Sequence, residues 1–126
     1  MATFTLLVTS APFDTQATAI QFAQAVLACG HRIEGVFFYQ AGVAHANCWQ
    51  SSPSDEYQPY RAWQQLAASG VPLHVCVTAA ARRGLVSPTE MEERNLTGCN
   101  LIPPFEVSGL GQLVELISKA DRLVQF

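Results

Sequence analysis

The sequence has few charges and almost no lysine. Only 13% of its 126 residues are charged, and 7 Lys and Arg face 10 Asp and Glu, which gives a formal net charge of −3. Lys119 is the single lysine, and the longest basic run is the pair Arg82 and Arg83. Proteins that hold nucleic-acid backbones need clustered cationic side chains, so direct contact with nucleic acid is excluded as the main source of binding.

Long apolar runs and a positively charged leader are also missing. The chain begins Met-Ala-Thr-Phe-Thr-Leu-Leu-Val-Thr, which is too short an apolar run for a signal peptide or a membrane span. We therefore expect a cytoplasmic protein that makes no contact with a membrane. The length fits one domain over residues 1–126, and a composition that is 49% hydrophobic leaves a surface suited to subunit contacts.

The cysteines follow no metal-binding or disulfide pattern. Cys29, Cys48, Cys76 and Cys99 are far apart, with neither a Cys-x-x-Cys pair nor the spacing of zinc ligands. In a reducing compartment we expect four free thiols, and we predict no metal or other cofactor.

Short apolar runs alternate with helical patterns along the chain. Strands are expected at 3–9, 33–39, 71–75, 105–107 and 121–126, and helices at about 14–28, 55–68, 78–83 and 108–119. The expected N-caps are Asp14 or Thr15, Ser54 or Asp55, and Ser108. This alternation predicts a three-layer α/β fold with about five mostly parallel strands, flavodoxin-like in outline.

Two stretches, residues 40–55 and 85–104, have no clear period. The first contains His45, Cys48 and Trp49, which we expect to be exposed at the sheet edge that also holds Cys76. The second is polar and acidic, and we expect a mobile segment with about one helical turn.

The stretch 71–84 places Cys76 where a strand becomes a helix. Ligands and chemistry in open α/β sheets usually lie at the carboxyl ends of the strands. Backbone amides in the first turn of a helix stabilise an anion, so this position favours a thiolate that acts as a nucleophile or holds a persulfide. A buried cysteine that serves only as a small hydrophobic side chain is an equally open interpretation.

The other candidates are weaker. Cys29 is expected to be a buried thiol at the carboxyl end of a helix, where the dipole opposes a thiolate. Cys48 could approach the active edge and Cys99 could act as a resolving thiol, but a plain loop cysteine is the favoured interpretation of each. His74 is expected to be a hydrogen-bonded core histidine. His45 is the better candidate for a mobile acid or base, although a solvated loop histidine is its default interpretation.

Two further spacings suggest phosphate chemistry, and both are weak signals, although a Cys-x5-Arg phosphatase stays as a third hypothesis. Cys76 and Arg82 satisfy the Cys-x5-Arg spacing of Cys-dependent phosphatases, but the intervening Val-Thr-Ala-Ala-Ala favours a helix that carries Arg82 about 9 Å along its axis. The Ser-Gly-Leu-Gly run that starts at Ser108 lacks the remaining residues of a nucleotide-binding loop, so a helix cap explains it.

The sequence resembles the DsrE/TusD family of small sulfur-relay subunits over almost its whole length. The residues that carry the resemblance are Thr15-Gln16 with 20–25, 36–39 with Gly42-Val43 and Ala46-Asn47, Ser54-Asp55-Glu56 with 61–66, Cys76-Val77 with Ala79-Ala80 and Arg82-Arg83-Gly84, and 108–111 with Asp121-Arg122 and 124–126.

The resemblance implies that Cys76 carries sulfur in a sulfurtransferase. TusD-like proteins accept persulfide sulfur from a TusA-type carrier and pass it to a TusE-type carrier, toward 2-thiouridine at the tRNA wobble position. They act in a heterohexamer with TusB-like and TusC-like subunits. A DsrE-like sulfur-oxidation relay and a non-catalytic assembly subunit are the alternatives, and the isolated chain could form a homo-oligomer. His45 or the segment 85–104 could gate access to Cys76.

Overall fold

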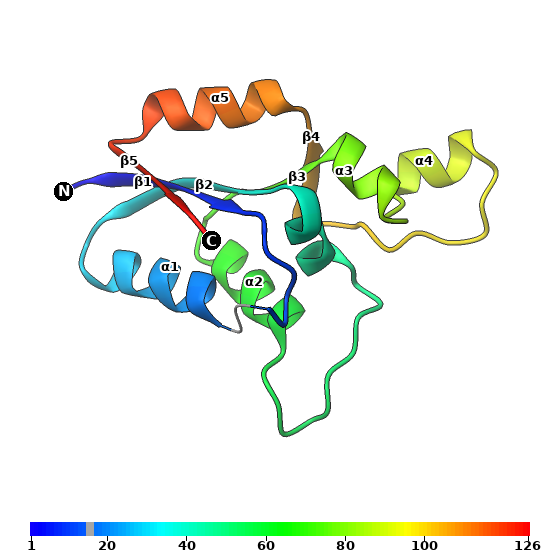
Figure 1. Cartoon of the computed structure of the whole chain (residues 1–126), viewed down its shortest axis with the longest axis horizontal. Helices are drawn as coiled ribbons and strands as arrows, with labels where there is room; N and C mark the ends of the chain where they lie inside the picture. The colour runs from blue at the N-terminus through cyan, green and yellow to red at the C-terminus, as the bar shows by residue number, and fades with distance from the viewer. Residues whose placement is uncertain (15–16) are drawn as a thin grey trace.

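A five-stranded parallel sheet forms the centre of the protein. The computed structural model describes residues 1–14 and 17–126, and its sheet has the order β4-β3-β2-β1-β5 with every neighbouring pair parallel (Figure 1). The strands are β1 (Thr3–Val8), β2 (Arg32–Phe38), β3 (Leu73–Cys76), β4 (Phe105–Ser108) and β5 (Arg122–Gln125). The predicted three-layer α/β fold with about five mostly parallel strands is confirmed.

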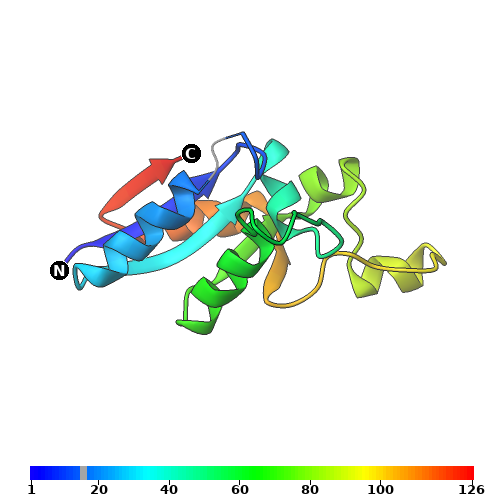
Figure 2. The ribbon, with the colours of Figure 1, turned by 90° about the horizontal axis from the view of Figure 1, so that it is seen from below.

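Helices cover both faces of the sheet. Helices α1 (Thr18–Ala28) and α2 (Pro59–Ala68) lie on one face, and α5 (Leu110–Lys119) lies on the other (Figure 1). The view from below shows α1 and α2 side by side in front of the strands (Figure 2). Three short helices, η1 (Gln40–Ala46), α3 (Val77–Arg82) and α4 (Pro88–Glu93), follow the carboxyl ends of β2 and β3.

The core lies on both sides of β2 because that strand is covered on both faces. Its consecutive residues Phe37 and Phe38 are both 0% exposed, as expected for a buried parallel strand. Phe38 meets Trp63 of α2 edge to face, with the ring centroids 5.0 Å apart. Full burial of such a side chain stabilises the fold by roughly 1.5–3 kcal/mol, so this contact holds α2 in place.

The expected caps of the first two long helices are wrong where the structure describes them. Helix α1 begins at Thr18 after Ala17, which makes no side-chain cap, and Asp14 lies in the preceding turn, while Thr15 falls outside the described residues. Helix α2 starts at Pro59 rather than after Ser54 or Asp55. Proline suits a first helical position because its ring fixes φ and no amide proton is lost there.

The fourth strand continues one residue further than predicted, and this changes the role of Ser108. Its hydroxyl lies 2.9 Å from Nδ1 of His74 on the neighbouring strand, and Gly109 takes the N-cap position of α5. The expectation that Ser108 caps this helix is therefore wrong. The serine is used to join two strand ends, so its oxygen does not satisfy a helix amide.

The segment 85–104 has the single short helix that was predicted. Helix α4 starts after Ser87, whose hydroxyl accepts a hydrogen bond from the backbone N–H of Glu90 at 3.2 Å. Leu85 and Leu101, each 2% exposed, anchor the two ends of the segment in the core. Its mobility stays a prediction. Within the described part of the chain, no helix is both long and apolar enough to cross a membrane.

Candidate functional site

Cys76 is the last residue of β3 and the N-cap of α3, as predicted. Its φ of −62° and ψ of 120° are extended, and the next residue, Val77, is already helical. The strand is short and wholly buried, whereas three alanines favour the helix that follows, so the chain changes conformation at the cysteine. The side chain is 3% exposed.

The strand order brings two other strand ends beside Cys76. Strand β3 lies between β2 and β4, and Cys76 is directly opposite Ser108 in the register. Tyr39 and Gln40 follow β2, and Gly109 follows β4, so all three strands deliver residues to one point of the carboxyl edge. This is the kind of crevice in which open α/β sheets bind ligands.

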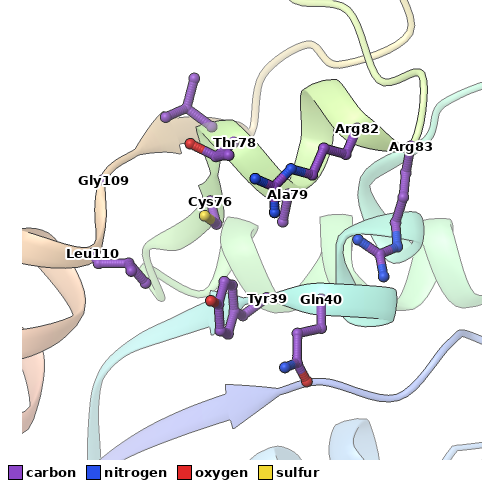
Figure 3. Close-up of a pocket in the computed structure, with 10 residues that line it drawn as sticks. Tyr39, Gln40, Cys76, Thr78, Ala79, Arg82, Arg83, Gly109 and Leu110 are labelled. Atoms are coloured by element: carbon purple, nitrogen blue, oxygen red, sulfur yellow. The ribbon is translucent and has the colours of Figure 1, made fainter.

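A cavity of about 510 Å³ opens at this point. It is lined by Tyr39, Gln40, Cys76, Val77, Thr78, Ala79, Arg82, Arg83, Gly109 and Leu110 (Figure 3). Its volume lies within the roughly 300–1,000 Å³ that small-molecule sites occupy. The thiol of Cys76 is therefore buried from bulk solvent and yet borders a space that another molecule can enter.

Arg82 and Arg83 give the cavity a cationic wall. Helix α3 is continuous, as predicted, but Figure 3 shows the side chain of Arg82 running back along it toward Cys76, while Arg83 extends toward Gln40. The sequence places Arg82 about 9 Å from Cys76 along the helix axis. Because its side chain runs back toward the cysteine, Arg82 still lines the cavity. Because the five residues between Cys76 and Arg82 are helical, they do not form the curled amide loop of a Cys-x5-Arg phosphatase.

His74 connects the ends of β3 and β4 through its side chain. It precedes Cys76 by two residues and therefore lies on the same side of β3. It is 8% exposed and hydrogen-bonded to Ser108, which confirms the prediction of a hydrogen-bonded core histidine. Burial lowers the pKa of His74, and the nearby Glu106 carboxylate opposes this shift. A neutral imidazole thus joins β3 to β4 beside Cys76.

His45 is neither the solvated loop histidine nor the mobile acid or base that the sequence suggested. It is 2% exposed, its Nε2 lies 3.0 Å from the carbonyl oxygen of Ser10, and its Nδ1 accepts a hydrogen bond from the indole of Trp63 at 3.0 Å. Burial lowers its pKa to about 4, with the Ser10 contact acting in the opposite direction. The error has a tertiary cause, since the sequence of this loop does not reveal that Trp63 of α2 covers it.

The other cysteines lie outside the cavity lining. Cys29 is exposed at the end of α1, so its expected burial is wrong: the helix ends where the core no longer covers it. Cys48 and Cys99 are half-buried loop residues, as their favoured interpretation predicted. Burial raises the pKa of Cys48, with a further increase from Cys99, against a lowering by its own backbone. Among residues 1–14 and 17–126, no cluster of three His, Cys, Asp or Glu side chains could hold a metal ion.

Sequence reasoning missed five of the cavity residues: Tyr39, Gln40, Arg83, Gly109 and Leu110. Four of them follow directly after strands, which is a signal that could have found them once β2 and β4 were known to flank β3. Gln40 has a further mark, a φ of 52° in the left-handed region that non-glycine residues rarely adopt. Such conformations concentrate at functional sites.

Comparison with known proteins gives full-length relatives. A Cronobacter sakazakii protein named Sulfurtransferase TusD is 50% identical, with 98% of this chain and 98% of the relative covered. A Yersinia pestis protein of the same name is 49% identical, with 98% and 96% covered. These relatives support sulfurtransferase activity for this chain.

The fold has a solved counterpart as well. The crystal structure of the E. coli ychN protein aligns with a TM-score of 0.70 over 100% of both chains, at 18% identity, and this likeness concerns the fold alone. Residues 2–126 match the DsrE/DsrF-like family. The family match runs from residue 2 to residue 126, and two full-length relatives are about 50% identical to this chain. The chain therefore belongs to the DsrE/DsrF-like family.

Proposed function

We propose that this chain is a relay subunit that carries persulfide sulfur on Cys76. One observation carries the proposal: of the four cysteines, all within the described residues, Cys76 alone lines the cavity at the carboxyl edge of the sheet. Burial of the thiol from bulk solvent suits a carrier, because a persulfide held there is shielded from other thiols until a partner reaches it.

The transfer is thiol exchange. The Cys76 thiolate attacks the terminal sulfur of a donor persulfide, a new sulfur–sulfur bond forms at Cys76, and the donor's sulfur–sulfur bond breaks to release the donor thiolate. In the second half, an acceptor thiolate attacks the terminal sulfur on Cys76 and restores the thiolate. Each half moves one sulfur atom and needs no external oxidant or reductant.

The specific route is the one known for TusD-like proteins. A TusA-type carrier supplies the sulfur, a TusE-type carrier receives it, and the product is 2-thiouridine at the tRNA wobble position in the cytoplasm. The chain touches no RNA in this scheme. A DsrE-like sulfur-oxidation relay uses the same chemistry and is the alternative route, which the carriers themselves distinguish.

Partners have to reach Cys76 over the mouth of the cavity. Val77 and Leu110 lie at this cavity and are 40% and 48% exposed, so they offer an apolar contact to an incoming carrier. TusB-like and TusC-like subunits complete the proposed heterohexamer. Co-purification of the three subunits and measurement of the mass of the complex test this assembly.

Mass spectrometry after loading tests the role of Cys76. The protein is incubated with cysteine, a cysteine desulfurase and a TusA-type carrier, and its peptides are mapped for the added mass of one sulfur atom. The sulfur is expected on Cys76, and it should be lost in Cys76→Ser but retained in the matched variants Cys29→Ser and Cys48→Ser. Sulfur that maps to another cysteine, or that persists in Cys76→Ser, contradicts the proposal.

A non-catalytic assembly subunit gives a different result. In that case the heterohexamer forms, but Cys76→Ser leaves both its mass and the passage of sulfur to the TusE-type carrier unchanged. If Cys76→Ser stops sulfur transfer to the TusE-type carrier while the complex stays intact, the transfer is assigned to Cys76.

A further inference from the structure

Two arginines in the cavity wall, Arg82 and Arg83, have no counter-ion among the residues that the structure describes. Arg32, Arg94 and Lys119 form ion pairs with glutamates, and Arg122 donates to the carbonyl oxygen of Asp121. Like the exposed Arg61 on α2, Arg82 and Arg83 form no ion pair or hydrogen bond through their guanidinium groups with any residue that the structure describes. Both belong to the wall of the cavity beside Cys76.

The rest of the cavity wall does not neutralise these charges. The ten lining residues include no carboxylate, and their other polar side chains are the uncharged Tyr39, Gln40 and Thr78. In a cleft lined by one sign of charge the field is concentrated and attracts ions of the opposite sign. Planar guanidinium groups also match the geometry of oxyanions, which they bind through paired hydrogen bonds.

The position of the thiol adds a second constraint on the ligand. Cys76 is 3% exposed, so a sulfur donor must enter the cavity to touch it. Figure 3 shows Arg82 reaching back toward the cysteine, so an anionic group held by the guanidinium would keep a neighbouring atom close to the sulfur. A ligand that fits both features has a transferable sulfur directly attached to an oxyanion.

We propose that the cavity accepts small anionic sulfur donors of the thiosulfate and thiosulfonate class, with Arg82 and Arg83 binding the sulfonate end and Cys76 receiving the outer sulfur. This inference rests on the proposed role of Cys76 as a sulfur carrier. It goes beyond that role because the protein then acquires sulfur from a small molecule without a protein carrier.

The reaction balances without a redox partner. The Cys76 thiolate attacks the outer sulfur of thiosulfate and forms a sulfur–sulfur bond, while the bond between the two donor sulfurs breaks and its electron pair leaves with the sulfonate sulfur as sulfite. Cys76 persulfide and sulfite are the products, and their total charge equals that of the thiolate and thiosulfate. The two guanidinium groups stabilise the sulfite as it leaves.

The test loads the purified chain with thiosulfate alone. We expect the mass of one sulfur atom on Cys76 and release of sulfite in equal amount. Arg82→Gln and Arg83→Gln should each slow loading by roughly tenfold, the value of a hydrogen bond to a charged group. Arg61→Gln, at an exposed position on α2 outside the cavity, is the matched control and should load like the unmodified chain.

Further variants and controls distinguish this inference from the proposed function. Arg82→Lys and Arg83→Lys keep the charge and should recover part of the rate, and thermal melting checks that each variant is folded. No loading from thiosulfate, in a preparation that loads normally from the desulfurase and carrier, overturns the inference alone. Equal loading in the glutamine variants also overturns it, as does an effect of these variants only on carrier-dependent loading. Failure of both routes contradicts the sulfur-carrier role itself.

Discussion

Trp63 donates its indole N–H to Nδ1 of His45 at 3.0 Å, with both side chains almost completely buried. Because Nδ1 accepts this bond, the imidazole carries its proton on Nε2 and donates it to the carbonyl oxygen of Ser10. A second proton would have to bind Nδ1, and this would break the hydrogen bond from Trp63. This explains in structural terms why the buried ring stays neutral.

The first prediction concerns acid stability. The pKa of His45 is lowered to about 4 from 6.5, so protonation favours the unfolded chain. The stabilisation is complete above pH 6.5, decreases as the pH falls, and is lost below about 4, for a total of about 3 kcal/mol. Urea unfolding between pH 7 and 4 should show this loss relative to His45→Gln. His31→Gln should keep it, and equal pH dependence in all three proteins contradicts the assignment.

The second prediction concerns the accessibility of the cysteines. Cys29 is exposed, whereas Cys76 is 3% exposed and is reached only through its cavity. A bulky maleimide dye should therefore label Cys29 first, while a small methanethiosulfonate reagent should also modify Cys76. Peptide mapping after short exposures measures both reactions, and denatured protein supplies the reference. Equal rates of dye labelling at the two sites in the folded chain are the contrary result.

The third prediction compares two glycines near the cavity edge. A Cβ on Gly42 would overlap the carbonyl oxygen of Val8 and lie 2.6 Å from its carbonyl carbon, so Gly42→Ala forces η1 away from β1. We expect a loss of about 3 kcal/mol or more in the free energy of unfolding. Gly111→Ala meets nothing within 4 Å at the start of α5 and should gain about 0.5–1 kcal/mol. Denaturant unfolding of both variants tests the contrast.

The fourth prediction addresses the segment 85–104. Asn100 is 5% exposed, and its side chain accepts from the N–H of Val86 at 2.7 Å and donates to the carbonyl oxygen of Gly84 at 3.3 Å. Asn100→Ala should cost about 1–3 kcal/mol because it leaves these groups unpaired. Hydrogen exchange should also become faster across α4, whereas the exposed Thr97→Ala should change little. Unchanged exchange in Asn100→Ala would show that the buried leucines alone hold the segment.

Most of the fold could be predicted from local patterns. The apolar strand before Cys76 and the alanine-rich helix after it are adjacent in the chain, so their order alone places the cysteine at a strand end. The resemblance named the family and Cys76 as its sulfur-carrying residue. The family and the fold are confirmed, and the role of Cys76 stays a proposal. Helix starts were less predictable, because α2 begins at Pro59 rather than after Ser54 or Asp55, and Ser108 bonds to His74 instead of capping α5.

The sequence by itself determined where strands and helices alternate and which cysteine lies at a strand-to-helix junction, since both depend on residues that are neighbours in the chain. Only the tertiary structure decided what surrounds that cysteine. The order of β2, β3 and β4 brings Tyr39 and Gly109 beside Cys76, and the Arg82 side chain runs back along its helix into the same cavity. Trp63 likewise buries His45 across a distance that no local pattern encodes. Long-range packing therefore set the chemistry of the site.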